Sequence, residues 1–447
     1  MLKPLRVKGV LSPRFHRLAK ELFWIGLGQA LAVLGAIMGV RLLTQVLNPT
    51  QYGELALGLT VVGLVTQLAF GPFQQGVLRF FGPAQEANEL HAYLVSVRVL
   101  FIRASVFIVG IAGVVLFGLW VSGHVKWIAL VATALVLALI SGYERVLDSM
   151  QSAARQRAVT AWHQALAQWL RFLVAFGLMV WWGASSSIAM LGYLMATIAV
   201  LISQFMFFRY SFGTLILSQS YEQIEVKKWA ERLKDYAWPF MTWGLFAWVQ
   251  QSSDRWALQT FSHLQDVGYY AVLYQLGYMP IILVTGIITQ FLQPILFARA
   301  GAGTDTVRVK RARQLNHQVI IAFIALTVLG TSVAAALHAH IFALLVGPEY
   351  RGVSQFMPWM VLSGGLFASS EVMALLFMSG VNTKILITPK IVTAVSGILL
   401  NTAGAFWLGL RGVVFASIGF SSVSLIGMFV LSLHSKRVEL RQGEERA

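Results

Sequence analysis

Three polar residues in one apolar stretch could bind an anionic group. Gln164, Gln168 and Arg171 have the i, i+4, i+7 spacing that places side chains on one face of a helix. At ~1.5 Å per residue, Arg171 lies roughly 15 Å from the nearer end of its stretch, where a charge is costly unless it is paired or hydrated. We favour an anion site that faces a cavity, because an arginine fork suits phosphate. The other interpretation is a structural ion pair with a carboxylate such as Glu144 or Glu371.

Glutamine recurs inside the apolar stretches. An amide in hydrocarbon needs hydrogen-bonding partners, so these side chains are expected to face other helices or water. Taken singly, each is more simply explained by a hydrogen bond between helices, worth about 0.6 kcal/mol. Taken together, they indicate a hydrated cavity that binds sugars, with Gln75 and Gln251 among the substrate contacts. The set comprises Gln29, Gln67, Gln74, Gln75, Gln164, Gln168, Gln250, Gln251, Gln275, Gln290 and Gln293.

Charged residues near the ends of two apolar stretches could form a gate. Arg41 and Arg255 fall at matching positions of an internal repeat, and Asp254 precedes Arg255. We predict a gate or an ion pair between the two halves; the alternative is ordinary interfacial charge. Glu371, inside a later stretch, is a candidate for proton or cation coupling, or a partner for Lys384.

The composition is that of a membrane protein. Of 447 residues, 57% are hydrophobic and 12% are charged, whereas a soluble protein has about a quarter charged residues. The chain has no cysteine, which excludes disulfides, a thiol nucleophile and a cysteine metal site. We predict no metal, no cofactor and no catalysis, because a membrane glycosyltransferase or polymerase would need carboxylates or a long outer loop for its chemistry.

Twelve apolar runs have about the 20 residues that cross ~30 Å of hydrocarbon. They predict transmembrane helices at about 22–43, 55–80, 99–122, 127–147, 161–182, 187–208, 236–261, 268–293, 315–337, 353–377, 385–406 and 412–433. The segment RLLTQVLNPTQYGELA at 41–56 aligns with DRWALQTFSHLQDVGYY at 254–270, which indicates a repeated six-helix unit. We therefore expect an all-α membrane protein with two pseudo-symmetric six-helix lobes, typical of transporters.

The chain divides accordingly into five segments. These are a basic arm at 1–21, a first lobe at 22–208, a linker at 209–235, a second lobe at 236–433 and a tail at 434–447. The linker has Lys227, Lys228, Arg232 and Lys234 around Trp229 and the following Trp238, which fits an interfacial amphipathic helix or a solvated one.

Basic residues are distributed asymmetrically between the two sets of predicted loops. The set that includes both termini holds most of the lysines and arginines, whereas the other set holds Arg41, Lys126, Arg255, Arg351 and Arg411. This positive-inside pattern predicts that both termini are cytoplasmic. It also explains the net charge of +16 by topology and attraction to anionic lipids, and not by nucleic-acid binding.

The chain resembles the polysaccharide-export flippases, the Wzx-like oligosaccharide flippases of the multidrug/oligosaccharidyl-lipid/polysaccharide exporter superfamily. The resemblance is carried in order by RLLTQVLNPTQYGELAL (41–57), DRWALQTFSHLQDVGYYAV (254–272), LLVGPEYRGVSQFMPWMVL (344–362) and LNTAGAFWLGLRGVVFASIGF (400–420). It implies a two-lobed twelve-helix bundle of the bacterial inner membrane that moves an undecaprenyl-diphosphate-linked oligosaccharide to the outer leaflet for O-antigen, capsule or exopolysaccharide synthesis. It also implies a polysaccharide polymerase and a chain-length regulator as partners.

Two related branches differ from this chain. The peptidoglycan-precursor flippases have fourteen helices and clustered arginines in the first two, whereas only Arg41 and Arg79 lie near those ends here. The multidrug extrusion branch places a carboxylate inside an early helix, whereas the predicted spans 22–43 and 55–80 contain none. Because Glu371 and Asp254 could still couple to protons, a cation-coupled multidrug antiporter remains the alternative.

Overall fold

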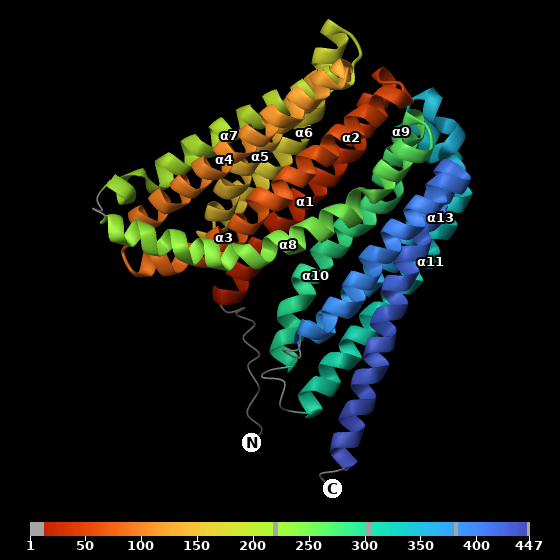
Figure 1. Ribbon diagram of the computed structural model, residues 1–447. Helices are drawn as coiled ribbons and strands as arrows, with labels where there is room; N and C mark the ends of the chain where they lie inside the picture. The colour runs from red at the N-terminus through yellow and green to blue at the C-terminus, as the bar shows by residue number, and fades with distance from the viewer. Residues whose placement is uncertain (1–12, 218–221, 301–305, 380–382, 445–447) are drawn as a thin grey trace, which may run out of the picture.

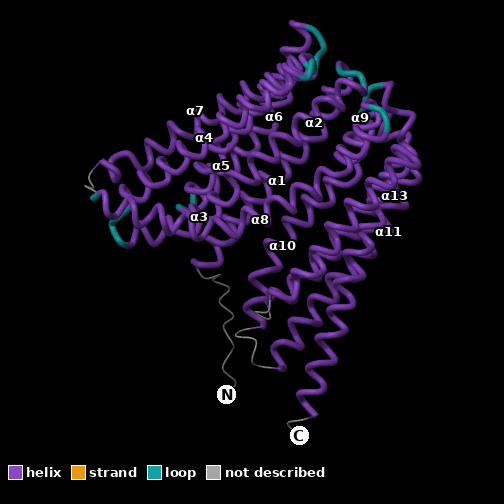
Figure 2. Tube along the Cα trace, in the orientation of Figure 1, coloured by secondary structure: helices purple, strands orange, loops and turns teal. Residues whose placement is uncertain are grey.

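A computed structural model describes residues 13–217, 222–300, 306–379 and 383–444. These residues form helices joined by short loops, with no strand among them (Figure 2). Long helices are the expected outcome for apolar sequence in lipid, because a helix satisfies its backbone hydrogen bonds within one segment.

The first half of the chain forms seven α-helices. Two of them, α2 and α3, are one continuous helix interrupted by a π-helical turn, η1. The elements are α1 (Pro13–Val46), α2 (Pro49–Val65), η1 (Thr66–Phe70), α3 (Gly71–Glu86), α4 (Leu90–Val121), η2 (Val125–Trp127), α5 (Ile128–Ala153), α6 (Arg157–Trp182) and α7 (Ser186–Leu217).

The second half repeats this plan, with α9 and α10 joined through a second π-helical turn, η3. The elements are α8 (Gln223–Phe261), α9 (Leu264–Leu273), η3 (Tyr274–Tyr278), α10 (Met279–Ala300), α11 (Thr306–Leu345), η4 (Pro348–Phe356), α12 (Met357–Ser379), η5 (Thr383–Leu386) and α13 (Ile387–Glu444). Within α13 the chain bends at Gly409, whose φ of 56° favours glycine.

The two halves form two lobes that meet at one end and diverge toward the other (Figure 1). The first residues of α1 and the last residues of α13 lie at the diverging end. We call the opposite end, built from residues 41–56, 262–269 and 344–350, the sealed end.

The hydrophobic core follows the same division. One buried cluster spans both lobes and includes Leu43 and Tyr52 of the first lobe with Tyr270 and Phe342 of the second. The other two clusters are separate, one around Phe81 and Trp229 and one built from α10–α13. The lobes therefore share a core at the sealed end, and α8 of the second half also contributes Trp229 to the cluster around Phe81.

Glycines allow the backbones to touch at the sealed end. A methyl group on Gly268 would collide with the Pro49 carbonyl, one on Gly53 with the Leu264 carbonyl, and one on Gly347 with the Thr44 carbonyl. The Gly347 amide donates to Thr44 Oγ1 at 3.0 Å. These contacts join α2 to α9, and α1 to the loop after α11.

Tyr350 adds a buried polar contact between the lobes. Its hydroxyl donates to the Leu47 carbonyl at 2.8 Å, and its ring makes an edge contact with Tyr52 at 5.9 Å between centroids. Burial raises the pKa of Tyr350, which keeps the hydroxyl protonated and able to donate.

The chain is a multi-pass membrane protein. Nine segments of the described residues are long and apolar enough to cross a membrane. The last of them, Ile387–Leu433, covers the final two predicted spans in one kinked helix. Neither α8 nor α12 is among the nine, so the count of twelve membrane-spanning helices stays a prediction. The cytoplasmic location of both termini stays a prediction as well.

The predicted linker at 209–235 is not a separate helix. Its first part extends α7 to Leu217 and its last part opens α8, while residues 218–221 lie outside the described residues. Trp229 is only 2% exposed and packs against Tyr93, and Lys228 pairs with Glu89 at 3.3 Å. This tryptophan therefore packs in the core of the first lobe, and the interfacial position of the segment stays a prediction. The division of the chain into five segments stays a prediction.

Candidate functional site

A cavity of about 730 Å³ lies in the second lobe. Its walls come from α8, α9, η3, α10, α12 and α13, and they combine aromatic and aliphatic side chains with a few polar ones. The volume falls in the range of about 300–1,000 Å³ that is usual for small-molecule sites. The cavity is therefore large enough to hold part of a ligand.

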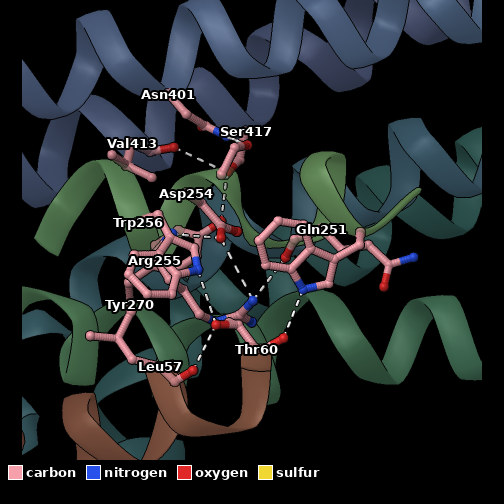
Figure 3. Close-up of polar contacts among 12 residues, drawn as sticks. Leu57, Thr60, Gln251, Asp254, Arg255, Trp256, Tyr270, Asn401, Val413 and Ser417 are labelled. Atoms are coloured by element: carbon pink, nitrogen blue, oxygen red, sulfur yellow. Dashed lines mark hydrogen bonds and ion pairs between the residues drawn. The ribbon is translucent and has the colours of Figure 1, made fainter. Parts of the chain in front are cut away.

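Asp254 and Arg255 form the first charged pair at this cavity, and both belong to α8 (Figure 3). The Arg255 backbone N–H donates to Asp254 Oδ1 at 2.7 Å, and the two side chains approach to 3.6 Å. The guanidinium also lies 4.7 Å from the ring centroid of Tyr274 and donates to the Gln251 carbonyl at 2.8 Å. Asp254 is 5% exposed and lines the cavity. The ion pair is thus within one helix, whereas the sequence suggested a pair between the lobes.

Three tyrosines continue this wall along one helical face. The hydroxyl groups of Tyr270 and Ser417 are 3.0 Å apart, which joins α9 to α13. The rings of Tyr274 and Tyr278 stack with centroids 4.9 Å apart. All three line the cavity. Their spacing of four residues, which places them on one helical face, is readable in the sequence.

Glu371 and Lys390 form the second charged pair. They reach the cavity from α12 and α13, and Lys390 Nζ lies 3.7 Å from Glu371 Oε1. The Glu371 side chain is 35% exposed. Lys384, the partner considered from sequence, has a side chain outside the described residues. In the sequence, Lys390 is one of the basic residues that the positive-inside pattern explains. That pattern did not indicate its place in the cavity.

The two carboxylates of the cavity wall, Asp254 and Glu371, are each paired with a cationic side chain, so the charges balance once these partners are counted. Lys390 belongs to the wall, whereas Arg255 pairs with Asp254 without being a wall residue. The remaining wall offers amides and hydroxyls next to apolar surface, for example Gln250 and Thr242 beside Phe246. Such a surface suits an uncharged amphipathic ligand.

The predicted glutamines have different positions. Gln251 lines the cavity, and its Oε1 accepts a hydrogen bond from Gln67 Nε2 of the first lobe at 3.2 Å. Gln75 is exposed on α3 and is not among the cavity residues. Gln164 donates to Asp148 Oδ2 at 3.1 Å, and Gln168 is half-buried on the same helix face.

Arg171 lies in the first lobe, away from the cavity wall of the second. Its guanidinium carbon is 5.5 Å from the ring centroid of Tyr193, and the charge of Glu144 on α5 is close enough to interact with it. Its Nε atom is buried, and this atom has no hydrogen-bond partner in the described part of the chain. The structure thus places Arg171 near Glu144, the carboxylate that the alternative interpretation from sequence named, and its role as an anion site stays a prediction.

Arg41 contacts the other lobe, but not through an acid. Its Nη1 donates to the Leu344 carbonyl at the end of α11. This bond lies at the sealed end, with the glycine contacts. Within the described residues, no group of three or more His, Cys, Asp or Glu side chains could hold a metal ion.

Comparisons with solved structures reveal the same fold. The lipid II flippase MurJ in an inward closed conformation is 10% identical, with a TM-score of 0.69 over 94% of this chain and 87% of that one. An inward-facing multidrug resistance MATE family transporter of the MOP superfamily is 13% identical, with a TM-score of 0.66 over 91% and 96% of the two chains. A mutant of the Vibrio cholerae MATE transporter VcmN is 15% identical, with a TM-score of 0.60 over 94% and 97%.

At this level of identity, these structures establish the fold alone. No curated protein sequence matches the chain. A family model described as polysaccharide biosynthesis protein matches residues 18–300, which is more than half of the sequence. The chain belongs to this polysaccharide biosynthesis protein family.

Proposed function

We propose that this protein is a flippase that moves an undecaprenyl-diphosphate-linked oligosaccharide across the bacterial inner membrane. The observation that carries the proposal is the amphipathic cavity of the second lobe, whose carboxylates are each paired with a cation. Neutral sugars suit such a cavity, because they have hydroxyl groups for hydrogen bonding and apolar ring faces. The family assignment to polysaccharide biosynthesis supports the same cargo.

In this proposal the two parts of the head group bind in different lobes. The glycan occupies the cavity, where Gln250 and Gln251 offer amides beside the tyrosine wall. The diphosphate approaches the half-buried Arg171, which has Gln164 and Gln168 on the same helix face. The polyprenyl tail stays in lipid. A polysaccharide polymerase and a chain-length regulator would act on the exported product.

Transport follows from alternating exposure of the site. The lobes diverge at the end with the termini, so cargo enters from that side, which we assign to the cytoplasm from the basic loops. The sealed end must then open to release the glycan outside, with Arg41 and the Asp254–Arg255 pair rearranging as a gate. Cargo drives this change only through a difference in its affinity for the two states.

A cation-coupled antiporter of the same superfamily is the second candidate. It is favoured by one observation, the partly exposed carboxylate of Glu371 in the cavity wall, which a proton or cation could reach. The charge balance of the cavity argues against a cationic drug as cargo, because no net negative charge remains to attract it.

Arg171 provides the test of the head-group site. In proteoliposomes containing a polyprenyl-diphosphate oligosaccharide, we expect Arg171→Ala to slow flipping by about tenfold or more, since hydrogen bonds to charged groups contribute about 1.5–3 kcal/mol. Arg171→Lys should be intermediate, because it keeps the charge and loses the fork. Arg103→Ala removes an exposed arginine of α4 and serves as the matched control.

Normal flipping by both Arg171 variants, at normal protein levels, would refute the anion site. Failure of the wild-type protein to flip this lipid, with or without an imposed proton gradient, would refute the flippase itself. Uptake of a lipophilic cation by the same vesicles would favour the antiporter.

A further inference from the structure

The two π-helical turns share a sequence motif. Residues 66–72 read TQLAFGP and residues 274–280 read YQLGYMP, so both have glutamine, leucine, a small residue, an aromatic residue and, two positions later, proline. The turns η1 and η3 cover the first five positions of each copy. The motif thus occurs once in each half, in the helices that correspond to each other.

The backbone of the two copies is also the same. The Gly71 N–H donates to the Thr66 carbonyl, and the Met279 N–H donates to the Tyr274 carbonyl, both across five residues. The next residue is Pro72 or Pro280, which has no N–H to donate. A wide turn followed by a missing donor weakens the helix at that point, and such irregularities are the usual places where helices bend.

The turns lie where the shared core ends and the separate cores begin. Leu55 of α2 and Val272 of α9 belong to the cluster that spans both lobes. Beyond the turns, Val77 of α3 belongs to the cluster of the first lobe and Leu296 of α10 to that of the second. Each interrupted helix therefore connects the sealed end to one diverging lobe.

Each turn also contacts the first helix of the opposite lobe. The turn η1 packs against α8, where Gln67 bonds to Gln251 and a methyl group on Gly244 would collide with the Gln67 carbonyl. The turn η3 packs against α1. This reciprocal placement is expected of two pivots between lobes that rotate against each other.

We propose that the two copies of this motif are the paired pivots about which the lobes rock to open the sealed end. The pivot of the second lobe carries Tyr274 and Tyr278, which line the cavity, so cargo contacts and bending involve the same turn. The inference rests on the proposed function in requiring that the sealed end opens, but it does not depend on which cargo is carried.

The test measures how often the sealed end opens. Thr44 is 4% exposed and bonds across the lobes, and the chain has no cysteine, so Thr44→Cys is a single reporter. A membrane-impermeant maleimide added to the sealed side of full-length protein in liposomes labels this position only when the lobes part. In the reporter background we compare Pro72→Ala/Pro280→Ala with Pro83→Ala, which replaces an exposed proline inside α3 away from either turn.

We expect the double variant to be labelled about tenfold more slowly, because alanine supplies the missing donor and stiffens both helices. Pro83→Ala should match the reporter protein, and melting temperatures should show that all three proteins are folded. Equal or faster labelling of the double variant would overturn the proposal that the two turns act as pivots. If the reporter protein itself is not labelled when the liposomes contain the polyprenyl-diphosphate oligosaccharide, the sealed end does not open. That result would contradict the proposed function.

Discussion

At the residue scale, paired charges determine what the cavity of the second lobe can accept. Glu371 and Lys390 lie 3.7 Å apart in its wall, and Asp254 lies beside Arg255. Charges inside a membrane protein are costly unless paired, and a paired set leaves little net attraction for an ionic ligand. A few side chains therefore determine which charge the cargo can carry in this cavity.

Changing the charge balance of the cavity should change which ligands it binds. We expect Lys390→Met, which leaves the cavity with an excess negative charge, to bind tetraphenylphosphonium about tenfold more tightly than the wild-type protein. The measurement is equilibrium binding of the labelled cation to purified protein. The matched control is Glu371→Gln/Lys390→Met, which restores the balance and should bind like wild type. Tight binding of the cation by wild type would contradict the charge argument.

The sequence predicted residue faces better than residue partners. It placed Gln164, Gln168 and Arg171 on one face of a helix, which depends only on helical periodicity. It did not predict that Asp254 pairs with Arg255, or that Glu371 pairs with Lys390. Partners depend on how helices pack and which rotamers they allow, and neither is encoded in spacing along the chain.

At the element scale, close backbone contact between α2 and α9 keeps the lobes together at the sealed end. Gly268 faces the Pro49 carbonyl, and Gly53 faces the Leu264 carbonyl, in both cases with no room for a side chain. Such contacts are lost entirely when the helices separate, so they favour the sealed state only.

Gly268→Ala should therefore shift the protein toward the open state. The added methyl group collides with backbone that cannot move away unless α2 and α9 part. With the Thr44→Cys reporter we expect labelling from the sealed side to be about tenfold faster. Gly118→Ala is the control, because its methyl group meets open space in α4 and alanine favours a helix by about 0.5–1 kcal/mol. Unchanged labelling of Gly268→Ala would show that this contact does not hold the lobes closed.

Helices were easier to predict than their interruptions. The apolar runs indicated a helix around 55–80 and another around 268–293, and both exist as continuous helices with a π-helical turn. Hydrophobic periodicity does not reveal one extra residue in a turn, although the repeated proline was a readable sign. The linker at 209–235 was harder, because its single tryptophan, Trp229, fitted an interfacial helix as well as the buried position that it occupies.

At the scale of the whole molecule, two lobes share a core at one end and diverge at the other (Figure 1). Large apolar side chains such as Phe107, Trp181 and Trp407 are exposed, which is expected of a surface in contact with lipid. The repeat and the composition predicted a two-lobed membrane protein. They could not predict which end is sealed, because both states of an alternating-access transporter satisfy the same hydrophobic pattern.

The most direct test of the central claim uses a strain that lacks the protein. Lipid-linked intermediates are extracted, and surface polysaccharide and resistance to cationic drugs are scored in the same cultures. The account predicts accumulation of polyprenyl-linked glycan and loss of surface polymer, both restored by the wild-type protein and not by Arg171→Ala. Unchanged glycolipids together with greater drug sensitivity would contradict it and identify the protein as an antiporter.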